Sequence, residues 1–164
     1  MMRQIALGTT LVAGLLAGTL PVAAGDEGHD LGLVTWMGRM QYYVHKLGLS
    51  LDAGNRALVG YYVHEVEEVI EEIEKIEDDD GVAVGSLVKK ILVPAFEALE
   101  GAFDSGDRGR LDAGYDRLIG ACNQCHESAN RFYLVIERRH DNPYMQRFEP
   151  RVFGVETPNQ PSSE

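Results

Sequence analysis

The spacing of apolar side chains restricts this chain to a helical fold. Between residues 31 and 53, and again between residues 55 and 77, apolar side chains recur in alternating steps of four and three. The two sets are Leu33, Met37, Met40, Val44, Leu47 and Leu51, then Val59, Tyr62, Val66, Val69, Ile73 and Ile76. Such steps place side chains on one face of an α-helix, and no strand-like alternation of useful length occurs. The sequence therefore predicts two amphipathic helices here.

Three short segments rich in Gly and Asp separate four predicted helices. A tight turn at residues 50–55 makes the first two helices antiparallel. A third helix is expected from about residue 82 to 103, with Pro94 kinking it or marking a restart. A fourth is expected from about residue 108 to 139. The predicted fold is an all-α antiparallel four-helix bundle with an extended, irregular C-terminal tail.

The first 24 residues have the composition of a secretory signal peptide. Arg3 precedes an apolar run over residues 5–22, and Ala23 and Ala24 supply a small-residue cleavage site. We expect cleavage after Ala24, export to the periplasm and no membrane anchor afterwards. The predicted organisation is then a signal peptide at 1–24, a helical domain at 25–140 and a tail at 141–164. Within the tail, residues 142–153 are expected to wrap around the bundle and the last ten to be loose.

The charge balance excludes several classes of partner. The formal net charge is −11, and removal of Arg3 with the signal peptide changes it to −12. Nucleic acids and anionic lipids need a basic surface, so neither is expected as a partner. Residues 65–80 contain ten acidic side chains and one basic side chain. Such a strip is either a solvated surface or a docking surface for a basic protein.

Both cysteines of the chain lie in residues 121–127, ACNQCHE. The pair could form a disulfide, half of a metal site or the attachment point of a c-type haem. A redox pair of the thioredoxin type begins a helix after a strand, and a zinc site needs a second ligand pair; neither is present here. Cysteines three residues apart on a helix share one face with the following histidine. The Cys-x-x-Cys-His spacing therefore favours one covalent haem c, held by Cys122 and Cys125, with His126 as the proximal iron ligand.

The signal peptide, the four helices and the Cys-x-x-Cys-His motif on the last helix resemble class II c-type cytochromes, the cytochrome c′ and cytochrome c556 group. The resemblance covers about residues 31–139, and the chain departs from the group by continuing 38 residues beyond His126. In the c556 group a methionine on the first helix binds the iron, which suggests Met40, or alternatively Met37. In cytochromes c′ an apolar residue faces the iron instead, and Val44 would fit that role. Bundles of this group can form homodimers through helices one and two.

Two further sets of side chains bear on the predicted haem site. Arg39 and Arg131 are candidate contacts for the haem propionates, because Arg binds carboxylates with paired hydrogen bonds. The tetrapeptide Tyr-Tyr-Val-His occurs twice, ending at His45 and His64. The helical period turns both histidines away from the core, so both are expected on the surface.

The function expected from these features is single-electron transfer to a redox partner protein. The alternative is binding or sensing of small gases such as NO and CO at an open sixth iron position. An enzymatic role is not expected. A non-haem interaction protein, with the cysteines in a metal site or a disulfide, is the third interpretation.

Overall fold

Helices α1 (Leu33–Asp52) and α2 (Arg56–Glu74) form the first hairpin of the protein. The computed structural model describes residues 32–151. The connection contains Gly54 with φ +65°, a left-handed conformation that favours glycine. The Asn55 side chain then caps α2 by accepting a hydrogen bond from the backbone N–H of Leu58 (3.2 Å). Both helices and the turn between them were predicted from the sequence.

A third rod consists of α3 (Val84–Leu87), the π-helical turn η1 (Val88–Leu92) and α4 (Val93–Ser105), which follow one another without a break. Pro94 lies in the first turn of α4, directly after the π-helical turn, and has no N–H to bond back to that turn. The π-helical turn before it is wider than an α-helical turn, because its hydrogen bonds reach back five residues. The irregularity predicted at Pro94 is present as a change from a π-helical to an α-helical turn, and the rod continues through it.

The fourth helix is shorter than predicted. Helix α5 spans Arg108–Ser128, and the Asp107 side chain caps it by accepting from the N–H of Arg110 (3.0 Å). The prediction that the helix continues to Arg139 is wrong. Asn130, with φ +57°, adopts a left-handed conformation that ends the helix.

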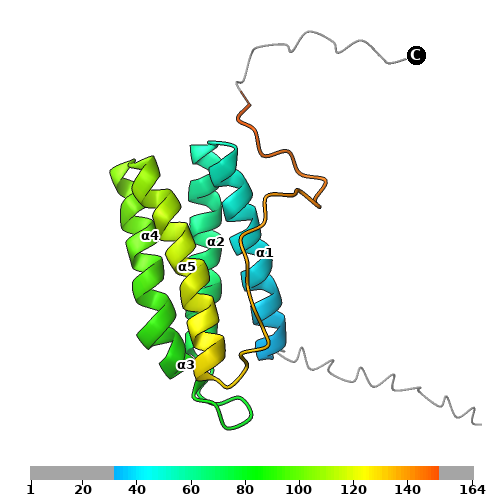
Figure 1. Ribbon diagram of the computed structural model, residues 1–164, viewed down its shortest axis with the longest axis vertical. Helices are drawn as coiled ribbons and strands as arrows, with labels where there is room; N and C mark the ends of the chain where they lie inside the picture. The colour runs from blue at the N-terminus through cyan, green and yellow to red at the C-terminus, as the bar shows by residue number, and fades with distance from the viewer. Residues whose placement is uncertain (1–31, 152–164) are drawn as a thin grey trace, which may run out of the picture. The chain divides into compact units, whose positions relative to one another are not determined.

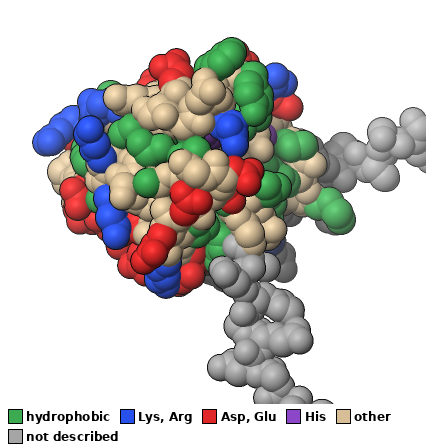
Figure 2. All heavy atoms as spheres, turned by 90° about the horizontal axis from the view of Figure 1, so that it is seen from below, with side chains coloured by type: hydrophobic (Ala, Val, Ile, Leu, Met, Phe, Trp, Pro, Cys, Tyr) green, Lys and Arg blue, Asp and Glu red, His purple; other side chains and the backbone are tan. Residues whose placement is uncertain are grey.

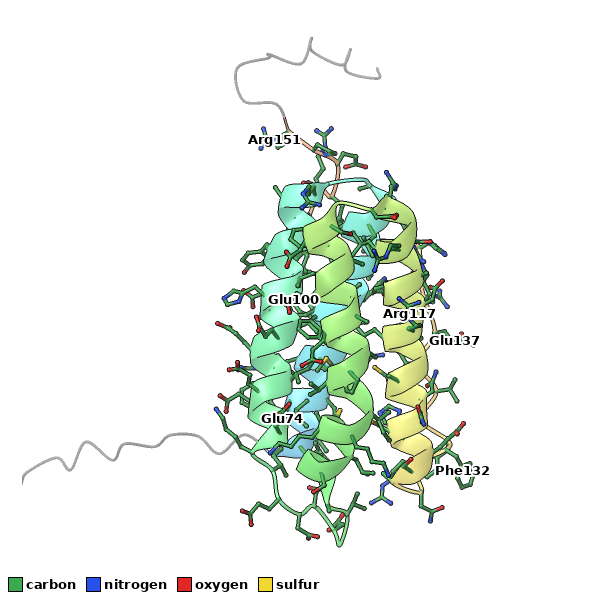
Figure 3. All side chains as sticks on the ribbon, turned by 90° about the vertical axis from the view of Figure 1, so that its left-hand side faces the viewer. Glu74, Glu100, Arg117, Phe132, Glu137 and Arg151 are labelled. Carbon is green, nitrogen blue, oxygen red and sulfur yellow. The ribbon has the colours of Figure 1, made fainter. Side chains whose placement is uncertain are left out.

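Beyond α5 the chain turns back instead of continuing outward. The Asn123 side chain accepts from the backbone N–H of Ile136 (2.8 Å) and donates to the carbonyl oxygen of Ile136 (2.9 Å). This pair of bonds holds the returning segment against α5. Phe132 of this segment is 67% exposed as a result, and its side chain projects from the returning segment in Figure 3.

Helices α1 and α5 lie side by side and run in opposite directions (Figure 1). Near one end of the bundle, the Arg108 guanidinium donates a hydrogen bond to the backbone carbonyl oxygen of Leu51 (3.2 Å). Further along α5, the Tyr115 hydroxyl donates to the backbone carbonyl oxygen of Val44 (3.0 Å). These two contacts fix the relative height of the helices. Met37 is seven residues before Val44 on α1, and Cys122 is seven residues after Tyr115 on α5. Met37 and Cys122 therefore lie at the same height in the bundle.

The core contains apolar side chains from every rod, which confirms the predicted all-α helical bundle. The fully buried large ones include Leu47, Val66, Ile73, Leu99 and Leu118. Within residues 32–151, no helix is long and apolar enough to span a lipid bilayer. The predicted signal peptide at 1–24 and the last 13 residues, 152–164, lie outside the described part of the chain.

Residues 129–151, which we call the strap, run back along the outside of the bundle (Figure 1). Arg138 of the strap binds Asp52 and Asp112 (2.8 Å each) and Asp116 (3.0 Å), which joins the strap to α1 and α5. Its guanidinium also lies over the ring of Tyr115 (5.1 Å to the centroid). The irregular segment therefore begins well before residue 141, where the tail was predicted to start.

A buried lysine holds the strap further along. Lys46 of α1 is 7% exposed, and its Nζ donates to Oε1 of Gln146 (2.8 Å). The ammonium lies 4.3 Å from the ring centroid of Tyr42 and 4.8 Å from that of Tyr144, which stabilises the charge by cation–π attraction. Phe148 is then buried against the bundle. The described part of the predicted wrapped segment does pack on the bundle.

Candidate functional site

A cavity of about 360 Å³ lies between α1, η1, α5 and the strap. Its wall is mostly apolar, and its volume is within the range of small-molecule and cofactor sites. The lining residues are Val34, Met37, Gly38, Met40, Gln41, Val44 and His45 of α1, Val88 and Leu92 of η1, Tyr115, Ile119, Cys122, Cys125 and His126 of α5, and Leu134, Ile136, Glu137 and Arg139 of the strap. The structure thus brings the three motif residues and both candidate methionines to one cavity.

The widened turn η1 forms the wall beside the cysteines. Val88 and Leu92 of this turn both line the cavity, and both are almost fully buried. The thiol of Cys125 makes a weak hydrogen bond to the carbonyl oxygen of Leu87, at 3.9 Å. The π-helical turn before Pro94 therefore shapes the part of the third rod that faces the motif.

The two cysteines are free thiols in an apolar environment. Burial raises the pKa of Cys122 to about 12, with a smaller contribution from Cys125, and burial raises the pKa of Cys125 to about 11. Both side chains are therefore neutral thiols at pH 7. A dithiol redox catalyst needs a lowered thiol pKa, so this environment opposes the thioredoxin-type interpretation.

His126 is oriented by the strap. Its Nδ1 lies 2.8 Å from the carbonyl oxygen of Leu134. A carbonyl oxygen only accepts, so Nδ1 carries the proton and Nε2 keeps its lone pair. Metal-binding histidines are typically held in this way, with one ring nitrogen donating to the protein and the other free for the metal.

The chemistry of the wall fits a haem better than a metal ion held by protein ligands alone. Within residues 32–151, no group of three or more His, Cys, Asp or Glu side chains could hold a metal ion. A haem needs no such group, because the porphyrin supplies four iron ligands. The apolar wall suits the macrocycle, and Cys122, Cys125 and His126 supply the two thiols and one imidazole that the predicted attachment requires.

The candidate sixth ligands lie on α1. Met40 is 5% exposed and Met37 is half-buried, and both line the cavity. Met37 lies at the height of Cys122, whereas Met40 lies nearer to the height of Ile119. Val44 also lines the wall, one turn beyond Met40.

The two arginines proposed as propionate contacts do not line the cavity. Arg39 is exposed and lies over the ring of Trp36 (4.9 Å to the centroid), on a face of α1 that adjoins the acidic residues of α2. Arg131 lies in the turn after α5. The strap instead brings Arg139 to the cavity, and the sequence analysis missed this residue because it placed Arg139 at the end of a helix.

The two histidines of the repeated tetrapeptide have different environments. His64 is exposed and lies near Glu67 (3.7 Å) and Glu68 (3.3 Å), as predicted. The same prediction is wrong for His45, which is partly buried and lines the cavity. Its Nδ1 is 3.0 Å from the hydroxyl of Tyr144, so the strap covers a side chain that the helical period turned toward solvent.

Searches with protein-family models, of curated proteins and of solved structures find no match to this chain. The interpretation of the site therefore depends on its own residues.

Proposed function

We propose that this protein is an exported, periplasmic c-type cytochrome that carries one covalent haem and transfers single electrons. The observation that carries the proposal is the position of the motif. Cys122, Cys125 and His126 share one wall of an apolar cavity, and Nδ1 of His126 is held by the Leu134 carbonyl so that Nε2 is free. When bound, the haem supplies the reversible Fe(III)/Fe(II) couple.

The two cysteines attach the haem by addition of their thiols to its vinyl groups. In each addition the sulfur would bond to one vinyl carbon, the thiol proton would go to the other, and the carbon–carbon double bond would become single. The addition would need no oxidant or reductant, because both thiols are already reduced and protonated. The apolar wall of α1 and η1 excludes water from the macrocycle, and burial and nearby charge set its reduction potential.

For electron transfer, a methionine of α1 would supply the second protein ligand of the iron, besides His126. Met40 and Met37 are both candidates, and the sulfur of either favours the reduced iron. A redox partner with a basic surface would be attracted to α2 and the turn after it, where Glu71, Glu77 and Asp78 are exposed. Figure 3 shows acidic side chains along this side of the bundle, with Glu74 at the end of α2.

A second candidate function is reversible binding of NO or CO at an open sixth position. One observation favours it. Gly38 lines the cavity in the part of α1 level with the motif, and no atom lies within 4 Å of the place that a Cβ at this position would occupy. The absent side chain leaves room for a small ligand beside the haem.

Mass spectrometry of the exported protein tests the proposal first. The protein is made in a host with haem-c maturation, beside the matched variant Cys122→Ser plus Cys125→Ser. We expect the wild type to gain the mass of one haem and the variant to gain none. A wild-type mass equal to that of the polypeptide alone, or covalent haem in the variant, would contradict the proposal.

Absorption spectra of the ferric, ferrous and CO-treated ferrous protein then distinguish the two functions. Low-spin spectra that CO leaves unchanged indicate a filled sixth position and electron transfer. In that case Met40→Ala and Met37→Ala identify the ligand, because the variant that loses it becomes high-spin. High-spin spectra that shift on addition of CO indicate gas binding.

A further inference from the structure

His45 lines the cavity, and one of its ring nitrogens is buried and unpaired. Its Nδ1 is paired with the Tyr144 hydroxyl (3.0 Å), whereas Nε2 is buried and has no hydrogen-bond partner among residues 32–151. Buried polar groups in folded proteins are nearly always hydrogen-bonded. The unpaired nitrogen is therefore a candidate hydrogen-bonding group for an occupant of the adjoining cavity.

The hydrogen bond to Tyr144 is compatible with a histidine proton on Nε2. His45 Nδ1 is the one hydrogen-bond partner of the Tyr144 hydroxyl within the described part of the chain. If that hydroxyl donates to Nδ1, its proton is satisfied and the histidine proton lies on Nε2. His45 then offers a hydrogen-bond donor to the occupant of the cavity.

His45 lies at the opposite end of the cavity from the cysteines. The Tyr115–Val44 hydrogen bond places His45, the residue after Val44, near the height of Tyr115. Cys122 is seven residues further along α5, which corresponds to about 10 Å along the helix axis at 1.5 Å per residue. A group attached at the cysteines must therefore extend along the cavity to reach His45.

A haem c has this extent and this polarity. Its thioether bonds are on one edge of the macrocycle, and its two carboxylates are on the opposite edge. We propose that Nε2 of His45 donates a hydrogen bond to a carboxylate of the bound haem, and that Tyr144 positions the imidazole for this contact. The proposal rests on the proposed function and replaces Arg39 and Arg131 as propionate contacts.

The charged groups nearby are compatible with this contact. Arg139 of the strap also lines the cavity and pairs with exposed Asp141 (2.9 Å), so it can turn toward a second carboxylate without leaving a buried charge. Glu137 lines the cavity as well, but its side chain is exposed and hydrated, which weakens its repulsion of an anion. Figure 3 shows Glu137 on the strap beside α5.

Resonance Raman spectroscopy of the haem-loaded protein tests the proposal. The propionate bending band rises in frequency when the carboxylate accepts a hydrogen bond. The variants are His45→Leu, which removes the donor, His45→Gln, which keeps an N–H at similar reach, and Tyr144→Phe, which removes the positioning bond. His64→Leu is the matched control, because His64 ends the same tetrapeptide but is exposed.

We expect the band to move to lower frequency in His45→Leu, to move less in Tyr144→Phe, and to stay in place in His45→Gln and His64→Leu. The axial-ligand bands should be the same in all five proteins. A band that does not move in His45→Leu overturns the proposal. So does a change in the axial-ligand bands with an unmoved propionate band, since His45 would then act at the iron.

Three other outcomes are interpreted separately. If His45→Leu does not fold, an unmoved band in Tyr144→Phe overturns the proposal by itself. If the wild type carries no covalent haem by mass, the proposed function fails. Loss of haem in the His45 variants alone would instead assign His45 to haem capture and support the contact.

Discussion

Replacement of Gly48 by alanine should destabilise the protein, although this change usually stabilises a helix. Gly48 lies inside α1, where glycine costs about 1 kcal/mol relative to alanine. A Cβ at this position would lie 2.5 Å from the hydroxyl oxygen of Tyr115 and 2.8 Å from its Cζ. Tyr115 is 1% exposed and cannot move away without losing its bond to Val44.

The expected magnitude follows from these opposing effects. Overpacking a core costs about 1–3 kcal/mol, loss of the Tyr115 hydrogen bond costs about 1 kcal/mol, and the gain in helix propensity offsets about 1 kcal/mol. The net loss should be about 1–3 kcal/mol, which at about 4 °C per kcal/mol for a domain of this size lowers the melting temperature by roughly 4–12 °C. Thermal and urea unfolding followed by circular dichroism measure both quantities.

A matched control and a second substitution make the test specific. Gly120 is an exposed glycine of α5 with no atom within 4 Å of a would-be Cβ, so Gly120→Ala should stabilise by about 0.5–1 kcal/mol. In a Tyr115→Phe background the hydroxyl is absent, and Gly48→Ala should cost at least about 0.5 kcal/mol less. If Gly48→Ala proves as stabilising as Gly120→Ala, the close contact between α1 and α5 is refuted.

Three further predictions concern the strap and the thiols. Burial alone would raise the pKa of Asp52, but hydrogen bonds from His140 and Arg138 bring it below its usual value. The ionised carboxylate therefore stabilises the folded protein fully at pH values above the pKa of Asp52 in the unfolded chain, and this stability is lost as the pH falls through the folded pKa. The variant Arg138→Gln should lower the stability at pH 7, and its urea midpoint should decline less steeply below about pH 4. Lys46→Met keeps the apolar stem but loses the bond to Gln146, so hydrogen exchange should become faster in the strap and stay unchanged in α2 and α4. In haem-free protein, the pKa of about 12 for Cys122 should make its alkylation by iodoacetamide at pH 8 about 10³ times slower than the alkylation of a free cysteine. The alkylation rate should still rise above pH 9. A rate that reaches a plateau near pH 9 would contradict the buried thiol.

The end of the bundle nearest the motif carries exposed apolar side chains. Figure 2, which views this end, shows apolar side chains among acidic and basic ones. Val34, Phe132, Tyr133 and Val135 are each at least 65% exposed, and Val34 lines the cavity. A haem in the cavity would lie behind this end.

Local patterns in the sequence determined the helices and the position of the motif. The all-α bundle was predictable because its signals act within one or two helical turns. These signals are the apolar steps of three and four, the caps Asn55 and Asp107, and the irregularity at Pro94. The spacing of Cys122, Cys125 and His126 on one helical face is equally local. The structure agrees with this part of the prediction.

Only the tertiary structure decided what surrounds the motif. The strap returns along α1 through contacts such as His45–Tyr144 and Lys46–Gln146, which join residues about a hundred positions apart, and no short-range period encodes them. These contacts bury His45, bring Arg139 to the cavity and leave Arg39 on another face. The reason is energetic. The returning chain covers apolar and aromatic surface on α1 and pairs the Arg138 guanidinium with three carboxylates, which stabilises it more than continued helix would.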